Sequence, residues 1–234
     1  MNVAFPARAG VLAVLLVVSG ATTLRAEIRS RSKDIIVLEP KDLPEQAQND
    51  GNSFFLFSDN DGSTYLYVEQ QQGARLITFD VTDPSKIKFL SSITLNSPTA
   101  FDFVRPLSGR AELIRFRNNQ GVAILDLHSA KKPVVKLISG LTNSGATESL
   151  GEMSFMMIDE PYNYVRAVPR DFQVIDVSSP DNPVLLTTVK QVKHKLLKDD
   201  TGTTFLLGGD GLTVIRKPRV EEEYEAQQRE TSTN

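Results

Sequence analysis

Short runs of alternating apolar and polar residues recur from about residue 34 to residue 217, and turn-forming residues separate them. Alternation with a period of two predicts β-strands, because successive side chains of a strand point to opposite faces. Helical periodicity is not sustained between these runs. The pattern therefore predicts an all-β fold.

The predicted strands belong to an internal repeat. Three segments align: LITFDVTDPSKIKFL (76–90), VAILDLHSAKKPVVK (122–136) and FQVIDVSSPDNPVLL (172–186). Each carries an Asp between two hydrophobic residues, then a small or polar pair, proline and a second apolar run; the three are Asp80, Asp126 and Asp176. LTVIRKPRV (212–220) is a degenerate fourth copy, in which Arg216 stands at the Asp position.

The spacing of the repeat is that of a four-stranded structural unit. The four aligned positions are 46, 50 and 40 residues apart, which is the range of one β-propeller blade. Two strands joined by a tight turn precede each copy, so each unit is expected to hold four strands. The predicted first strands are FFLFSD (54–59), AFDFVRP (100–106), SFMMIDE (154–160) and HKLLKDD (194–200).

The Asp/Pro turn of the repeat has a physical basis. An Asp carboxylate or a Ser hydroxyl can accept a hydrogen bond from a backbone N–H two residues on, which fixes the bend. Proline sets φ and cannot donate to a strand ladder, so it belongs at a turn or an outer edge. One such sheet cannot bury its own faces, so the units are expected to stack around an axis.

The runs at 76–90 and 172–186 resemble LVIVD repeats, which form β-propellers in secreted and surface proteins. The resemblance covers roughly residues 50–220 and implies a small propeller of about four blades of four antiparallel strands. Five blades, with residues 34–50 as a reduced first blade, is the alternative. DIIVLEP (34–40) has no partner in its own unit and is expected to complete the last blade beside GLTVIRK (211–217).

The first 26 residues have the layout of a secretory signal peptide. Arg8 supplies a positive charge, AGVLAVLLVVSGA (9–21) is an apolar run, and LRA (24–26) ends in a small residue. The alternative is a membrane anchor, but the run is shorter than the roughly 20 residues that a spanning helix needs. Cleavage near Ala26, a secreted or periplasmic location and no later membrane insertion are therefore expected.

The remaining chain divides into a propeller domain, residues 27–220, and a polar, acidic tail, residues 221–234. The tail is interpreted either as the start of a short helix or as disordered. GLTNSGATESLGEM (140–153) is the longest insertion and is expected to be a loop on the rim.

Composition excludes some chemistry. The chain has 234 residues, a net charge of −3 and no cysteine. A disulfide, a thiolate nucleophile and a cysteine metal site are therefore impossible, and the charge does not suggest a nucleic-acid binder. Histidine occurs at His128, a turn position of the repeat, and at His194, at the start of a predicted inner strand. Neither is accompanied by the motif of a catalytic triad.

Three local motifs have both a structural and a functional interpretation. SDNDGSTY (58–65) offers Asp59 and Asp61 as oxygen ligands for calcium, but Asn and Asp-Gly are also usual hairpin residues, and no EF-hand spacing follows. GGDG (208–211) is interpreted as a hairpin, because no Lys-Ser or Lys-Thr follows it. KQVKHKLLK (190–198) is either a patch for an anionic partner or the protection of an exposed strand edge.

The sequence identifies no catalytic, cofactor-binding or metal-binding residue. The function that it favours is an exported, non-enzymatic binding module with a protein partner. The alternatives are a small-ligand or calcium-binding propeller that uses Asp59 and Asp61, or a hydrolase or lyase that uses carboxylates in the central channel. The last hypothesis requires several ionisable side chains that converge on the axis.

Overall fold

The computed structural model describes residues 27–107, 110–137, 147–149, 155–157, 166–176 and 183–232. All strand pairs there are antiparallel, so the all-β expectation is confirmed. The predicted signal peptide, residues 1–26, lies outside the described residues. No described helix is both long and apolar enough to cross a membrane.

Sheets I and II each contain four consecutive strands, as the repeat predicts. Sheet I consists of β3 (Ser53–Ser58), β4 (Thr64–Gln70), β5 (Arg75–Asp80) and β6 (Lys88–Thr94). Sheet II consists of β7 (Phe101–Leu107), β8 (Ala111–Phe116), β9 (Val122–Asp126) and β10 (Val134–Leu137). Spatial order follows chain order in both sheets, because each strand is joined to the next by a short connection.

Among the described residues, the third unit does not show a four-stranded sheet. Sheet III there holds two strands, β13 (Arg170–Asp176) and β14 (Val184–Val192), and residues 166–169 carry no strand. A separate pair joins β11 (Thr147–Ser149) to β12 (Phe155–Met157). The insertion 140–153, expected to be a loop, therefore contributes a strand that pairs with the predicted first strand of this unit.

Sheet IV is completed by the N-terminal segment, as expected. Its order is β1 (Ile28–Arg29), β2 (Ile36–Leu38), β17 (Gly211–Arg216), β16 (Thr203–Gly208) and β15 (His194–Lys198). Val37 of β2 lies opposite Ile215 of β17 in the register. Two 3-10 turns, η1 (Pro40–Asp42) and η2 (Glu45–Gln48), then lead from β2 to sheet I.

The Asp turns of the repeat form as the side-chain chemistry predicts. Asp80 Oδ1 accepts the Thr82 backbone N–H at 3.0 Å, and Asp126 Oδ1 accepts that of His128 at 3.0 Å. The proline of the first copy begins a 3-10 turn, η4 (Pro84–Lys86). Asp176 makes a contact with another element, because its Oδ2 accepts the Arg31 backbone N–H at 2.8 Å. This third Asp thus ties sheet III to the connection between β1 and β2.

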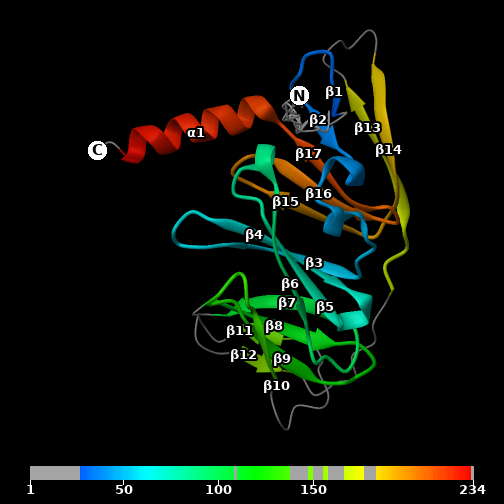
Figure 1. Cartoon of the computed structure of the whole chain (residues 1–234), viewed down its shortest axis with the longest axis vertical. Helices are drawn as coiled ribbons and strands as arrows, with labels where there is room; N and C mark the ends of the chain where they lie inside the picture. The colour runs from blue at the N-terminus through cyan, green and yellow to red at the C-terminus, as the bar shows by residue number, and fades with distance from the viewer. Residues whose placement is uncertain are drawn as a thin grey trace, which may run out of the picture.

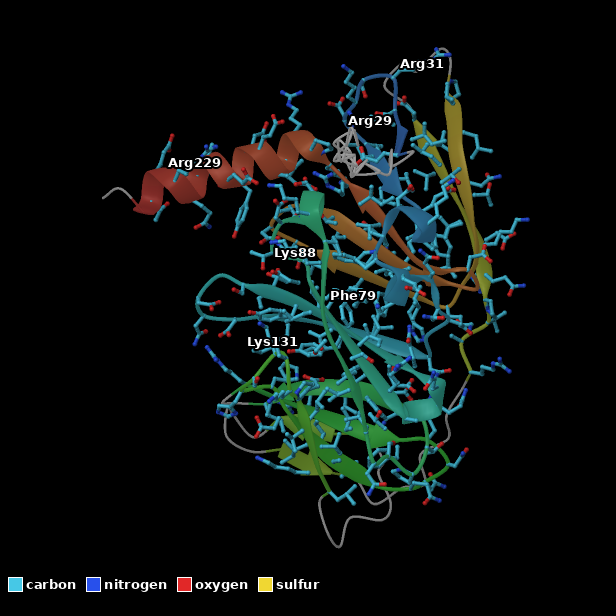
Figure 2. The ribbon with its side chains drawn as sticks, in the orientation of Figure 1. Arg29, Arg31, Phe79, Lys88, Lys131 and Arg229 are labelled. Atoms are coloured by element: carbon cyan, nitrogen blue, oxygen red, sulfur yellow. The ribbon has the colours of Figure 1, made fainter. Side chains whose placement is uncertain are left out.

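Sheets II, I and IV lie in this order one above the other, and sheet III stands upright beside sheet IV (Figure 1). Both faces of sheet I are buried: Leu66 and Phe79 contribute to a core shared with sheet IV, while Tyr67 faces a core shared with sheet II. Phe79, labelled in Figure 2, lies near the middle of the molecule. A smaller core joins sheets III and IV through Val189 and Leu206. Three apolar interfaces therefore hold four sheets together.

Sheet III is covered less completely than its repeat partners. Phe79 and Leu125 are fully buried, whereas Ile175, at the equivalent position of the third copy, is 45% exposed. Leu185, which pairs with Ile175 across the sheet, is also exposed. The apolar character of the repeat is thus retained at a face that the described residues leave open.

A single α-helix follows sheet IV in the described chain. Helix α1 (Pro218–Ser232) begins three residues before the predicted tail, and the first of the two alternatives for that tail, a helix, is the one observed. The helix projects away from the sheets (Figure 1). Glu221 is buried at its base, and the residues from Glu225 to Thr231 are exposed.

We expect Gly73→Ala to destabilise the fold far more than Gly62→Ala. Both glycines have left-handed φ values, +89° and +85°, so both substitutions incur a backbone cost of about 1–2 kcal/mol. An added Cβ at Gly73 would lie 2.1 Å from the Thr99 carbonyl oxygen, whereas nothing lies within 4 Å at Gly62. Urea unfolding of both variants measures the difference; equal losses would contradict the close approach of sheets I and II.

Candidate functional sites at the two ends of the strands

A polar network lies at the end of the strands where β3, β7 and β15 begin. It consists of Asn52 and Glu69 from sheet I, Asp102 and Arg117 from sheet II, and His194 from sheet IV. These residues are distant in sequence and meet because the first strands of the three sheets are neighbours. Ionisable groups from three sheets thus lie together, and the surroundings of each group decide what it can do.

Glu69 is fully buried at the end of β4. The Asn52 Nδ2 donates to its Oε1 at 3.1 Å, and Oε2 has no hydrogen-bond partner among the described residues. Burial raises the pKa of Glu69 to about 7, although the Asn52 hydrogen bond and the Arg117 charge act in the opposite direction. The carboxyl group therefore exchanges a proton near neutral pH. It is enclosed, and its hydrogen bond to Asn52 links it to the rest of the network.

Arg117 and Asp102 form the charged part of the network. Arg117 Nη2 donates to Asp102 Oδ1 at 2.7 Å and to the Asn52 carbonyl oxygen at 3.3 Å. The Arg117 backbone N–H also donates to the Ala100 carbonyl oxygen at 2.9 Å. Because the guanidinium reaches both sheets, it fixes the position of sheet I relative to sheet II. Asp102 is engaged in this pair and is not poised as a free nucleophile.

His194 is the half-buried member of the network. Its ring meets the Phe54 ring edge-on, with centroids 6.1 Å apart. Burial lowers the pKa of His194, and the Asp102 charge opposes this shift while those of Arg117 and Lys193 reinforce it. The imidazole is therefore neutral at neutral pH. The prediction that His194 begins a strand is confirmed, although this strand, β15, lies at the edge of sheet IV. The sequence gave no indication of the neighbours of His194.

The sequence reasoning missed the other four members of the network. One signal was available for Glu69, which follows Tyr65 and Tyr67 at alternate positions of one strand. A glutamate on the apolar side of a strand is buried and needs a hydrogen-bond partner. Asn52, Asp102 and Arg117 follow no such pattern, because their contacts are made between sheets.

A pocket of about 280 Å³ opens beside the network. Two hairpins supply part of its wall, the turn at Gln71–Gln72 and the turn at Asn118–Asn119. All four residues have left-handed φ values between 53° and 59°. Two consecutive residues with positive φ are typical of the hairpin turns whose twist matches that of the strands. This conformation places Gln72 and Asn118 at the pocket.

The opposite end of the strands holds the anchor of α1. Arg216 and Glu221 form a buried ion pair, with Nη2 2.6 Å from Oε2, and Thr203 Oγ1 donates to Glu221 at 3.4 Å. This contact explains why Arg216 replaces the Asp of the repeat. The fourth unit has no Asp turn to close, because β2, the strand that pairs with β17, comes from the N-terminal segment.

A second charged pair supports the first turns of α1. The Lys198 ammonium is buried and lies 2.6 Å from Asp200 Oδ2, and it also sits 5.4 Å from the centre of the Tyr224 ring. A cleft of about 370 Å³ separates the helix from the turns of sheet I. Its walls include Gly62 and Pro84 on the sheet side and Tyr224, Glu225 and Gln228 on the helix side.

The proposed calcium motif forms a hairpin. Asp59 is paired with Arg110 at 2.7 Å, and Asp61 Oδ1 accepts the Ser63 N–H at 2.8 Å. The two carboxylates thus serve different partners. Throughout the described ranges, no group of three or more His, Asp or Glu residues is arranged to hold a metal ion.

The other motifs also have structural roles. GGDG joins β16 to β17, which confirms the hairpin interpretation. The lysine-rich segment does not form one patch, since Lys193 pairs with Asp50 at one end of β15 and Lys198 with Asp200 at the other. His128 is an exposed turn residue, as its position in the repeat predicts, and its Nδ1 lies 2.6 Å from Asp126 Oδ1.

No protein-family model matches this chain, and no curated protein matches it. The LVIVD resemblance therefore rests on the residues of the repeat.

We expect Glu69→Gln to remove a pH dependence from the stability. A carboxyl group with a raised pKa remains protonated in the folded state while it ionises in the unfolded chain, so stability falls from about pH 4.5 to about pH 7. The shift corresponds to about 3 kcal/mol. Chemical denaturation at pH 5 and pH 8 should show a loss that is smaller by this amount in the variant than in the wild type, while the exposed control Glu222→Gln keeps the full loss. Part of the loss remains in every variant, because burial also raises the pKa of Glu112, to about 8. Identical pH profiles for wild type and Glu69→Gln would contradict the assignment.

Breaking the Arg216–Glu221 pair should lower the free energy of unfolding. Glu221→Ala leaves a buried guanidinium without its partner, and such losses amount to about 3–5 kcal/mol. The double variant Arg216→Met, Glu221→Leu removes both charges and should recover most of the free energy of unfolding. The two variants are compared by urea denaturation; a double variant as unstable as the single one would argue against charge burial as the cause.

Proposed function

We propose that this chain is an exported β-propeller of LVIVD-like repeats that binds another protein through the cleft beneath α1. The repeat period and the apolar segment at residues 9–21 support the propeller and the export. Cleavage near Ala26 leaves a secreted or periplasmic protein with no membrane insertion and no affinity for nucleic acid.

The order of the sheets supports a four-bladed ring. Units placed around a circle in chain order have the neighbours I–II, II–III, III–IV and IV–I. Three of these four pairings occur among the described residues, and sheets II and III stand at the two ends of the stack. Closure between sheets II and III would cover the exposed Ile175, whose equivalents Phe79 and Leu125 are buried.

The observation that carries the binding proposal is the projection of α1. Its first two turns are held by Glu221 and Tyr224, whereas the rest lies away from the sheets (Figure 1). Arg229, labelled in Figure 2, lies on this outer part. A polar helix gains little from its own sequence, because most helix stability in proteins comes from packing of an apolar face. The buried charged anchor therefore maintains a helix that does not serve the core.

The chemistry of the cleft favours a partner with a basic segment. Exposed glutamates on the helix outnumber its two arginines; they are Glu222, Glu223, Glu225 and Glu230. The Tyr224 ring and Pro84 give the cleft apolar walls. Its charged lining residues are Asp83, Glu221, Glu225 and Arg229, so acidic side chains outnumber the basic one. Opposite charge steers association and fixes orientation, while burial of aromatic and proline surface supplies affinity.

The test is a pull-down with tagged protein from an extracellular or envelope extract, repeated with two charge-reversal variants. Glu225→Lys changes the cleft. Glu223→Lys makes the same charge change about 200° around the helix, on its far side. We expect a partner that the wild type and Glu223→Lys retain, that Glu225→Lys loses at least tenfold, and that elutes with 0.5 M salt, as screening of exposed charges requires. Equal retention by all three proteins would reject this surface.

A further inference from the structure

The pocket beside the polar network has a lining rich in hydrogen-bond donors. Its polar side chains come from sheet I, sheet II and the segment before sheet III; they are Asn52, Gln72, Thr99, Arg117, Asn118 and Arg166. These are three carboxamides, one hydroxyl and two guanidinium groups. A site of this composition suits a ligand with several oxygen atoms and a negative charge.

Two features show that the lining is held in place. Arg117 is 11% exposed at its side chain and is fixed by Asp102, and the carboxamide of Asn52 is fixed by Glu69 and Gln72. Gln72 and Asn118 stand on hairpins with two successive left-handed residues. Side chains that are already ordered lose less entropy when they bind a ligand.

The charge of the pocket comes from Arg166. The charge of Arg117 is balanced by Asp102 at 2.7 Å, whereas Arg166 is exposed at the wall. A guanidinium matches the two oxygen atoms of a carboxylate, and carboxamides and hydroxyls match the hydroxyl groups of a polyol. The volume, about 280 Å³, lies just below the range typical of drug-sized ligands.

We propose that this pocket binds a small hydroxycarboxylate of the size of a sugar acid. Arg166 holds the carboxylate, and the carboxamides of Gln72 and Asn118 bind the hydroxyl groups. The site lies at the opposite end of the strands from the cleft beneath α1, so it is independent of the protein-binding proposal.

The probes are glucuronate, glucose, inorganic phosphate and sodium chloride at matched ionic strength, with the purified protein. Glucuronate at ten times its dissociation constant should raise the melting temperature by about 3–6 °C. Glucose lacks the charge and phosphate lacks the polyol, so neither should shift it by more than the salt control. No shift with glucuronate, or an equal shift with phosphate, would overturn the proposal.

Matched variants locate the site. Arg166→Gln should weaken glucuronate binding at least tenfold in calorimetric titration, while Arg170→Gln makes the same change on β13, outside the pocket, and should not. Asn118→Asp keeps the size and the left-handed turn but repels a carboxylate, whereas Asn119→Asp adds the same charge beside the pocket lining. Equal affinities within each pair would overturn the assignment, and melting temperatures without ligand show that the variants fold.

Discussion

The structure depends on one constraint: sheet I is apolar on both faces, and each face must be covered by another sheet. Phe79 and Leu66 need sheet IV, and Tyr67 needs sheet II, because no strand of sheet I can hide them. Burial of such side chains contributes about 1.5–3 kcal/mol each. The stack is therefore a consequence of composition, and the interfaces between sheets hold the molecule together more than any single hydrogen-bonded ladder does.

The same constraint sends charged side chains to the ends of the strands. The interiors of the interfaces are apolar, so charged side chains that link one element to another lie where strands begin or end. Arg117 pairs with Asp102 within sheet II and also donates to the Asn52 carbonyl oxygen beside sheet I, at one end of the strands. Arg216 pairs with Glu221 and so joins sheet IV to α1 at the other end. The charged contacts between elements are thus concentrated at two separate surfaces, away from the apolar interfaces.

The sequence predicted the strands of sheets I and II, those of sheet IV other than β1, the hairpins and the partner of DIIVLEP, because alternation and turn residues are local signals. The helix was left open, since PRVEEEYEAQQRETS has no apolar stripe and its anchor is an ion pair. The polar network was missed for a different reason. Asn52, Asp102 and His194 come from three units of the chain, and only the stacking of the sheets brings them together. Only Glu69 could have been found from a local pattern, because it follows Tyr65 and Tyr67 at alternate positions of one strand.

The pairing of β2 with β17 also sets the order in which the protein can fold. The partners Leu38 and Val214 stand near opposite ends of the chain, so the last sheet cannot be completed until nearly all of it has been made. At usual rates of synthesis, Val214 is added on the order of ten seconds after Leu38. Until then the sheet I face that carries Leu66 and Phe79 has no cover. A chain in this state exposes apolar surface, which favours aggregation until the last strands are added.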